Sequence, residues 1–375
     1  MNFLLIPDKF KGSLTSEEVS KAFMAGVAQA GITNTFQYIK ASDGGDGFMD
    51  AVSHYKRCIA IQVISQNPLG KPQRSHYLYN QESNAAYIEM AKSSGMVLLS
   101  EQERNPMLTS TYGTGLEIKD AIEKGVKNIY VGLGGSATND GGIGIAHALG
   151  FDFLDADGNS LAPIGENLSK ISSIDDAKTN VLPKDIYFYA INDVTNPLYG
   201  DNGAAHVYAA QKGADEGMIE ELDAGLQNLD KVIIEQFQKE YANTPGSGAA
   251  GGTAYGLKCF LGANYISGID FILELSGVRQ ILAKERFDFI VTGEGKIDEQ
   301  TLNGKLIQGV MRLAKEFELP VLAVCGKLDV PLEELKNKGV QDVLEIQDTS
   351  RDLDYNMMNA AKLLTEKTAN YLKKM

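Results

Sequence analysis

The amino-terminal part of the chain passes from an apolar run through a polar turn into an amphipathic stretch. Residues 2–6, NFLLI, form a short and mainly apolar run. After a polar segment, Thr15 and Glu18 have the spacing of a capping box, and apolar positions then recur at helical intervals to about Ala30. This pattern predicts a buried strand, a loop and a helix, in that order.

The carboxyl-terminal part repeats the alternation. Residues 287–291 are strand-like, residues 293–304 are polar and rich in glycine, and residues 305–317 follow a helical pattern. Further strands are predicted at 321–325 and 342–346. Alternating strands and helices form parallel sheets covered by helices, and each end alone is short for such a sheet. We therefore expect the two ends of the chain to form one domain.

The middle of the chain contains the elements of a second domain, including a hairpin-like turn and a long helical stretch. A chain of 375 residues is also long enough for two cores. The predicted fold is a two-domain α/β protein. A discontinuous outer domain, residues 1–65 with 285–375, has a mostly parallel sheet with flanking helices. An inserted α/β domain, residues 66–284, carries a glycine-rich ligand loop.

That loop lies within residues 128–150, where an apolar strand leads into glycines and then into a helical pattern. Glycines before a helix suit an anion, because the backbone can approach closely and free N–H groups point at the ligand. Gly132, Gly134 and Ala137 also satisfy GxGxxA, and Asp152 follows at the distance of a dinucleotide fingerprint. A dinucleotide site is therefore one alternative.

Polar side chains within the loop favour a different ligand. Oxygen-bearing residues follow the paired glycines Gly134 and Gly135, and they suit a metal–phosphate or hydroxy-acid site better than a bare pyrophosphate turn. These residues are Ser136, Thr138, Asn139 and Asp140. A second glycine loop, at 245–252, precedes a helical run and is interpreted either as a phosphate cradle or as a packing turn.

Three more loops carry charged residues next to predicted strands. Asp193 follows a buried-looking strand at a position where a carboxylate can bind magnesium or act as a base. Residues 291–305 combine glycines with carboxylates and lysines, a mixture that phosphoryl transfer needs. Residues 7–14 and 42–47 add further lysines and aspartates. The GxxxxGK[ST] pattern of Walker-type enzymes does not occur.

The charge balance and the cysteines narrow the class of protein. Lys and Arg total 35 and Asp and Glu total 49, so the formal net charge is −14, which argues against nucleic acid as a partner. The three cysteines have no CxxC spacing and are expected to be buried thiols. We find neither a signal-peptide core nor a membrane-spanning run, and we expect a cytoplasmic protein with no membrane partner. The sequence does not assign an oligomeric state.

Taken together, these loops resemble the motifs of type-I glycerate kinases, in the same order and over nearly the whole chain. The matching segments are PDKFKGSL from residue 7, SDGGDG from 42, GTGLE from 113, GLGGSATNDGG from 132, NDVTNPLYG from 192, QKGA from 211, PGSGAAGG from 245 and TGEGKID from 292. The resemblance implies ATP- and Mg²⁺-dependent phosphorylation of D-glycerate in the cytoplasm. It favours 2-phosphoglycerate over 3-phosphoglycerate, in glycerate, glyoxylate or sugar-acid catabolism.

Two alternatives are kept beside the kinase. One is an NAD-dependent hydroxy-acid dehydrogenase, based on the GxGxxA pattern, and the other is a non-catalytic protein that binds a phosphorylated metabolite. For the kinase, physical reasoning assigns Asp193 as base or magnesium ligand, Lys11 as the transition-state cation and Asp140 as a second magnesium ligand. The expected substrate- or phosphate-binding residues are Ser13, Asp43, Gly134, Gly135, Ser136, Thr138, Asn139, Lys212, Gly293, Glu294, Gly295, Lys296 and Asp298.

Overall fold

The chain folds into two compact units. The computed structural model describes residues 1–33, 35–41, 47–181, 185–298 and 305–375. The first unit comprises Met1–Asp43 and Ile269–Met375, and the second comprises Gly44–Gly268. Both chain ends belong to the first unit. Residues 59–65, which we had assigned to the outer domain, pair in a strand of the second unit instead.

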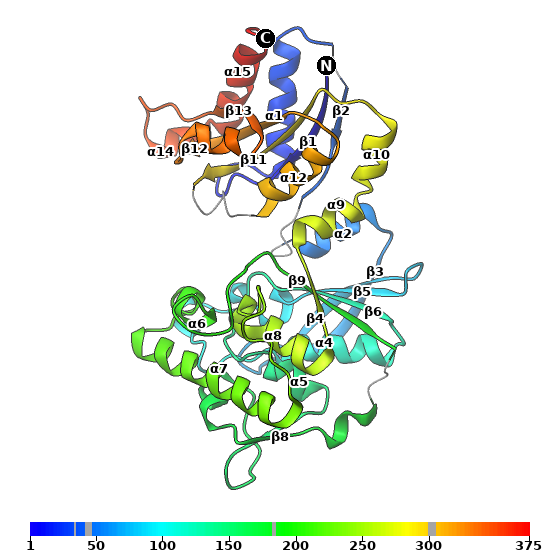
Figure 1. The fold of residues 1–375 in the computed structure, drawn as a ribbon, viewed down its shortest axis with the longest axis vertical. Helices are drawn as coiled ribbons and strands as arrows, with labels where there is room; N and C mark the ends of the chain where they lie inside the picture. Colours follow the sequence, from blue (N-terminus) through cyan, green and yellow to red (C-terminus); the bar gives the residue numbers. More distant parts are fainter. Residues whose placement is uncertain (34, 42–46, 182–184, 299–304) are drawn as a thin grey trace. The chain divides into compact units, whose positions relative to one another are not determined.

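The first unit is built on a five-stranded sheet in the order β13-β12-β11-β1-β2, in which each neighbouring pair is parallel. The predicted parallel sheet with flanking helices is confirmed (Figure 1). Its elements are β1 (Asn2–Pro7), α1 (Ser16–Gln29), β2 (Thr35–Tyr38), α9 (Gly268–Leu275), α10 (Val278–Lys284), β11 (Phe289–Ile297), α12 (Lys305–Glu316), β12 (Val321–Leu328), α13 (Leu332–Asn337), β13 (Val340–Glu345), α14 (Leu353–Met358) and α15 (Ala360–Leu372).

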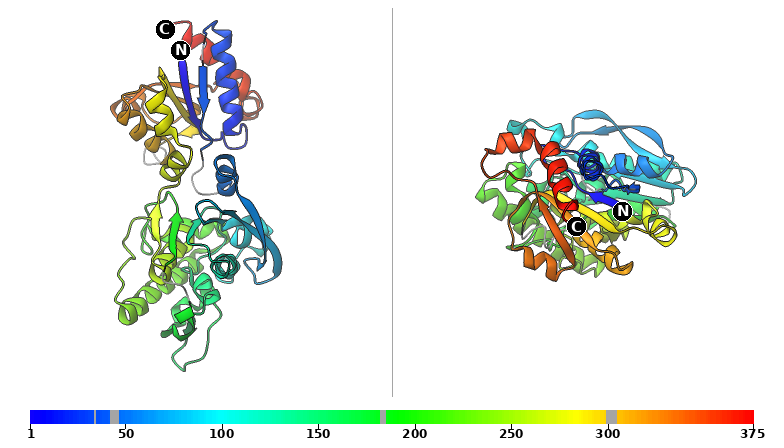
Figure 2. Two further views of the ribbon diagram at one scale, coloured as in Figure 1. Left: turned by 90° about the vertical axis from the view of Figure 1, so that its right-hand side faces the viewer. Right: turned by 90° about the horizontal axis from the view of Figure 1, so that it is seen from above.

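Helix α1 begins where the sequence predicts, because the Thr15 hydroxyl accepts the Glu18 N–H while the Glu18 carboxylate accepts the Thr15 N–H. Helices α1 and α15 lie side by side, blue and red in Figure 1 and in the left view of Figure 2. A side chain at Gly26 would place its Cβ 2.5 Å from the Thr365 carbonyl oxygen, so glycine allows this close approach.

The glycine-rich stretch after residue 292 is a strand and not the loop that we expected. Strand β11 continues through Ile297, and Gly293 pairs with Val324 of β12. A Cβ at Gly293 would lie 1.9 Å from the Val324 carbonyl oxygen. The glycines are therefore compatible with a strand because they allow the two backbones to pack closely.

The second unit contains a six-stranded sheet in the order β10-β9-β6-β5-β4-β3. Strands β5, β6, β9 and β10 are parallel neighbours, and β4 runs antiparallel to β3 and to β5. The elements of this unit are α2 (Phe48–Tyr55), β3 (Ile59–Gln66), β4 (Pro72–Asn80), β5 (Ala85–Glu89), α3 (Ala91–Ser94), α4 (Tyr112–Glu123), β6 (Asn128–Gly132), α5 (Ile143–Ala148), β7 (Asp152–Leu154), β8 (Ser173–Asp175), β9 (Tyr187–Ile191), α6 (Ala204–Tyr208), α7 (Glu216–Phe237), α8 (Ala249–Leu261) and β10 (Asn264–Ile266).

Most strands of this sheet end at one edge. Strands β3, β5, β6, β9 and β10 run in the same direction, so the loops that follow Glu89, Gly132 and Ile191 leave the sheet together. In open α/β sheets, ligands bind at this carboxyl edge. The register therefore brings the glycine loop and Asp193 to neighbouring positions, because β6 and β9 are adjacent.

The structure also bears on the expected long helix, the cysteines and the expected absence of a membrane span. The long helical stretch of the middle region is helix α7, which ends at Phe237, and Gln238 follows with φ +56°. Cys259 and Cys325 are buried thiols as expected, whereas Cys58 is partly exposed. In the described part of the chain, the structure contains no helix both long and apolar enough to cross a membrane.

The core of the second unit contains one carboxyl group that the sequence pattern did not single out. Glu117 of α4 is completely buried, and neither of its carboxyl oxygens has a hydrogen-bond partner in the part of the chain described. Burial raises the pKa of Glu117 to about 8, and the neighbouring Glu89 adds to the rise. The side chain is therefore mostly protonated at neutral pH.

We predict that Glu117→Gln makes the stability of the protein less dependent on pH. Because the folded pKa lies above that of the unfolded chain, the wild-type protein loses stability as the pH rises from about 5 to about 8. Glutamine does not titrate, so the melting temperature of the variant should gain on wild type over this interval and then run parallel. Glu123→Gln, an exposed change on the same helix, is the control. A constant difference across this range would contradict the prediction.

Candidate active site

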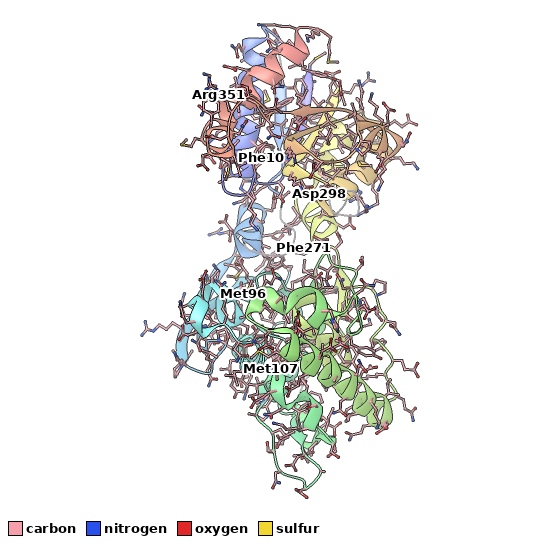
Figure 3. All side chains as sticks on the ribbon, turned by 90° about the vertical axis from the view of Figure 1, so that its left-hand side faces the viewer. Phe10, Met96, Met107, Phe271, Asp298 and Arg351 are labelled. Carbon is pink, nitrogen blue, oxygen red and sulfur yellow. The ribbon has the colours of Figure 1, made fainter. Side chains whose placement is uncertain are left out.

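The glycine loop after β6, residues 133–142, is fastened to the segment between β5 and α4. The Ala137 N–H donates to the Ser94 carbonyl oxygen at 2.9 Å, and the Met96 N–H donates to the Gly135 carbonyl oxygen at 2.9 Å. Thr109 adds a bond from its hydroxyl to the Ala137 carbonyl oxygen at 2.9 Å. Met96 and Met107 of this segment are labelled in Figure 3. These three hydrogen bonds hold the glycine loop against that segment.

Asp140 organises the turn from this loop into α5. Its carboxylate is fully buried and accepts four hydrogen bonds, from the Thr111 N–H and hydroxyl and from the N–H groups of Gly142 and Gly144, at 2.8–3.2 Å. Burial raises the pKa of Asp140, and these donors lower it in part. With its oxygens engaged by the protein, Asp140 is better suited to a structural role than to the magnesium role that we expected.

The second glycine loop packs against the first. A Cβ at Gly251 would lie 2.1 Å from the Thr138 carbonyl oxygen, and the Gly141 N–H donates to the Gly251 carbonyl oxygen at 3.0 Å. Residues 250–252 have positive φ, and the regular helix follows from about Thr253. Of the two interpretations, this geometry favours the packing turn.

Lys212 is buried beside the glycine loop. Its ammonium donates to the Ser136 hydroxyl at 3.0 Å and to the Thr138 carbonyl oxygen at 2.7 Å, and only 3% of the residue is exposed. Within the described residues no carboxylate lies within 4.0 Å of the ammonium. Burial lowers the pKa of Lys212 to about 7, although the charge of Asp140 opposes the shift. An unpaired buried ammonium is costly, and a bound anion would relieve that cost.

Uncharged polar atoms of the same loop lack hydrogen-bond partners within the described parts of the chain. They are Thr138 Oγ1, Asn139 Oδ1 and Nδ2, and, on the segment after β9, Asn192 Nδ2. Thr138 and Asn139 are fully buried. Buried polar groups normally find partners, so these atoms mark the loop as a place where a polar ligand can supply them.

Asp193 follows the end of β9, on the strand next to β6. Its Oδ1 accepts the Ser267 hydroxyl at 2.8 Å and the Gly268 N–H at 3.0 Å. Ser267 follows β10 and Gly268 is the first residue of α9, and together they fix the direction of the carboxyl group. The second unit thus places Ser136, Thr138 and Asn139 after β6 and Asp193 after the adjacent β9, while Lys212 is bonded to the glycine loop.

In the first unit, the loop after β1 lies against β11. The Asp8 N–H donates to the Gly293 carbonyl oxygen at 2.8 Å, and a Cβ at Gly295 would lie 3.2 Å from the Lys11 backbone nitrogen. Phe10 of this loop and Asp298 beyond β11 are labelled in Figure 3. The candidates Lys11, Ser13 and Gly293–Asp298 therefore occupy one edge of this sheet.

The side chains at that edge are solvent-accessible. The ammonium of Lys296 forms ion pairs with Asp298 at 3.2 Å and Asp329 at 2.9 Å, and the pKa of Lys296 is raised by these partners, Asp329 first. Lys11 is exposed, and the Ser13 hydroxyl donates to the Phe10 carbonyl oxygen at 3.2 Å. Exposed pairs of this kind contribute little stability, so the lysines remain available to a ligand. Asp43 lies outside the described residues.

Arg104 is a cation near the loop that sequence reasoning missed. It follows the short 3₁₀ helix Glu101–Glu103 and packs against Gly213, where a Cβ would lie 2.2 Å from the Arg104 carbonyl oxygen. The residue adjoins no predicted strand and no glycine run, so only its place in the folded chain distinguishes it.

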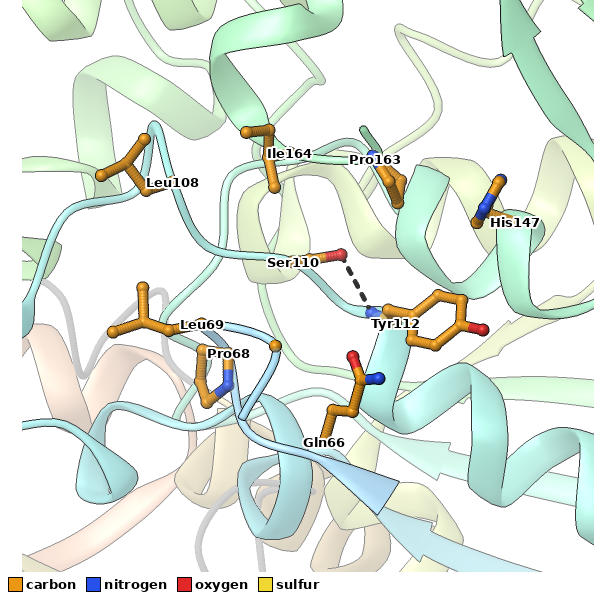
Figure 4. A pocket seen from close by; sticks show the side chains of 10 residues that line it. Gln66, Pro68, Leu69, Leu108, Ser110, Tyr112, His147, Pro163 and Ile164 are labelled. Carbon is orange, nitrogen blue, oxygen red and sulfur yellow. Dashed lines mark hydrogen bonds between the residues drawn. The ribbon is translucent and has the colours of Figure 1, made fainter. Parts of the chain in front are cut away.

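An open cavity of about 340 Å³ lies in the second unit, next to the start of α4 (Figure 4). Pro68, Leu69 and Ile164 form part of its apolar wall, and Ser110 lies on the polar side, where its hydroxyl accepts the Tyr112 N–H at 3.2 Å. None of the predicted site residues lines this cavity. We therefore keep the candidate site at the glycine loop.

Comparison with known proteins decides the family. A sequence model of the glycerate kinase family matches residues 3–375. The chain belongs to the glycerate kinase family. It is therefore a kinase, which rules against the dehydrogenase and the non-catalytic alternatives, and the family resemblance read from the motifs is confirmed.

Relatives in this glycerate kinase family match over almost their whole length. A glycerate kinase of Halalkalibacterium halodurans is 36% identical over 99% of this chain and 97% of its own. The glycerate 2-kinase of Escherichia coli K12 is 34% identical over 94% and 92%. A solved structure from Salmonella typhimurium LT2, described as a glycerate kinase 2, superposes with a TM-score of 0.80 at 33% identity, covering 100% of this chain and 98% of that one.

We predict that Thr111→Val destabilises the second unit by about 2 kcal/mol, because it removes the hydroxyl donor to the buried Asp140 and the acceptor of the Ile145 N–H. Thr109→Val is the comparison, because it removes a single neutral hydrogen bond and should cost about 1 kcal/mol. Urea unfolding of both variants measures the difference. Equal losses would show that the carboxylate does not depend on Thr111.

Proposed function

We propose that the protein transfers the γ-phosphoryl group of ATP to D-glycerate, with Mg²⁺, and forms 2-phosphoglycerate. The observation that carries this proposal is the buried Lys212 ammonium, which is bonded to the glycine loop. This ammonium has no carboxylate partner within the described residues. Membership of the glycerate kinase family supports glycerate as the acceptor, and the name of the Escherichia coli relative supports transfer to O2. The reaction would belong to cytoplasmic glycerate, glyoxylate or sugar-acid catabolism.

Charge supports the assignment of the second unit to the acceptor. Glycerate is a carboxylate at neutral pH, and it would be the counter-ion that Lys212 lacks. Its two hydroxyls would meet the buried polar atoms of Thr138 and Asn139, which have no partners within the described residues. Binding would therefore satisfy atoms that otherwise weaken the fold.

Asp193 is the carboxylate placed to act on the reacting hydroxyl or on the metal. A base must lie within hydrogen-bond reach of the hydroxyl, and Asp193 is already oriented by Ser267 and Gly268. The Lys212 ammonium and the loop would hold the acceptor, so that attack begins from one orientation. Both roles for Asp193, base and magnesium ligand, remain proposals.

The residues present also fit a magnesium ion held in part by ATP. Among the described residues, no group of three or more His, Cys, Asp or Glu side chains gathers to enclose a metal. Magnesium in phosphoryl-transfer enzymes is usually held by one or two carboxylates together with phosphate oxygens, which suits Asp193. When bound, the ion would neutralise charge on the transferring phosphate. Lys11 and Lys296 of the first unit are the candidates to bind phosphate oxygens of ATP.

The test is phosphorus NMR of the purified protein with Mg²⁺, ATP and D-glycerate, beside controls that lack one component or contain L-glycerate. We expect a phosphomonoester signal that requires D-glycerate, with the coupling pattern of 2-phosphoglycerate. Signals of 3-phosphoglycerate would correct the position of transfer. ATP that stays intact in the complete mixture would refute the proposed reaction.

Within the same assay, Asp193→Asn should lower turnover roughly 10²- to 10⁴-fold, because the amide neither accepts a proton nor carries charge for a metal. Asp201→Asn, an exposed change on the same connecting segment, should leave turnover within about two-fold. Unchanged turnover in Asp193→Asn would remove this residue from the mechanism.

A further inference from the structure

Arg104 is a cation with no carboxylate partner among the residues that the structure describes. Its Nε is buried and has no hydrogen-bond partner among the residues that the structure describes. The neighbouring carboxylate of Glu103 is engaged elsewhere, by the Lys71 ammonium at 2.9 Å and by Ser100. In a chain with 49 acidic and 35 basic residues, an arginine can readily find a surface carboxylate, so its unpaired state calls for a ligand.

The backbone of Arg104 lies directly beside Lys212. Gly213, the residue after Lys212, has φ +98°, and a Cβ at that position would lie 3.1 Å from the Arg104 Cβ. The segment that follows Arg104 is bonded to the glycine loop through Thr109 and Thr111. Lys212 thus bonds the glycine loop directly, and the backbone of Arg104 adjoins the residue that follows Lys212.

Resting on the proposed function, we propose that Arg104 binds the carboxylate of glycerate, with Lys212 as the second cation of the same subsite. The planar guanidinium offers paired N–H donors that match the two oxygens of a carboxylate. The Lys212 ammonium donates two of its three N–H groups to Ser136 and Thr138. It therefore offers the carboxylate its charge and one remaining N–H.

The neighbours of this cation pair favour the acceptor over the triphosphate. Thr138 and Asn139 offer neutral hydroxyl and amide groups, which suit the hydroxyls of a small hydroxy acid. A triphosphate carries several negative charges, which are met by magnesium and further lysines. Arg104 therefore determines specificity for an acid over a neutral alcohol.

The test compares Arg104→Gln with wild type in steady-state phosphorylation of D-glycerate. We expect the KM for D-glycerate to rise roughly 10- to 100-fold, since a charge-assisted hydrogen bond is lost. The KM for ATP should change less than about two-fold, and Arg104→Lys should recover part of the loss. Arg74→Gln, an exposed arginine of the same unit, is the matched control and should resemble wild type.

A second substrate separates recognition from a general structural effect. D-glyceramide replaces the carboxylate by a neutral amide, so wild type should strongly prefer D-glycerate in kcat/KM. Arg104→Gln should lose a clear part of that preference, because only Lys212 is then left to distinguish the charged group. Melting temperatures of all variants confirm that they fold.

Three results would overturn the proposal: an unchanged KM for D-glycerate, a rise in the KM for ATP alone, or an unchanged preference for D-glycerate over D-glyceramide. Calorimetry separates this failure from failure of the proposed reaction. Protein that binds D-glycerate through Arg104 without making a phosphomonoester would refute the reaction and support the binding residue. Protein that phosphorylates D-glycerate equally well without Arg104 would do the reverse.

Discussion

The buried carboxylate of Asp140 is the interaction on which the candidate site depends. Four donors converge on it, two from Thr111 before α4 and one each from Gly142 and Gly144 at the start of α5, and they fix the end of the glycine loop. Glycines alone would leave this loop many conformations, so its shape has to come from fixed hydrogen bonds. In the proposed site, this carboxylate shapes the loop that would bind an anion and would not itself contact the anion. An acidic residue can therefore lie at the centre of a site proposed for acidic ligands.

Near that carboxylate, the second unit has cations without carboxylate partners and buried polar atoms without hydrogen-bond partners in the described ranges of the chain. Lys212 is held by two neutral oxygens, and the pKa of its ammonium is lowered by burial to about 7. Such an arrangement lowers the stability of the ligand-free protein, and binding of an anion, as proposed, would offset that loss. A strained or unsatisfied group at a functional site is the expected trade between stability and activity. Membership of the glycerate kinase family is consistent with such a site, because glycerate is an anion.

Local sequence patterns predicted the helices and strands but not the contacts between them. The Thr15–Glu18 capping box and the strand, glycine loop and helix at 128–150 were readable because their signals lie within a few residues. The glycines at 293 and 295 were misread as a loop, because only pairing with β12 and the loop after β1 shows why a strand needs them. Arg104 was missed for the same reason: its proximity to Lys212 depends on packing between segments more than a hundred residues apart in the sequence. Burial of Lys212 and of Glu117 likewise follows from tertiary structure, which single residues do not reveal.

The central claim is that Lys212 binds the anionic substrate. The uptake of protons when D-glycerate binds tests this claim most directly. At pH 8.5 the ammonium should be largely deprotonated in the free protein, because burial lowers the pKa of Lys212 to about 7. A bound carboxylate would raise that pKa again. Titration calorimetry of D-glycerate in buffers of different ionisation enthalpy should therefore report an uptake of about one proton per ligand. The Lys212→Met variant should show no such uptake. Binding heats that do not depend on the buffer, or an uptake that persists in Lys212→Met, would contradict the account.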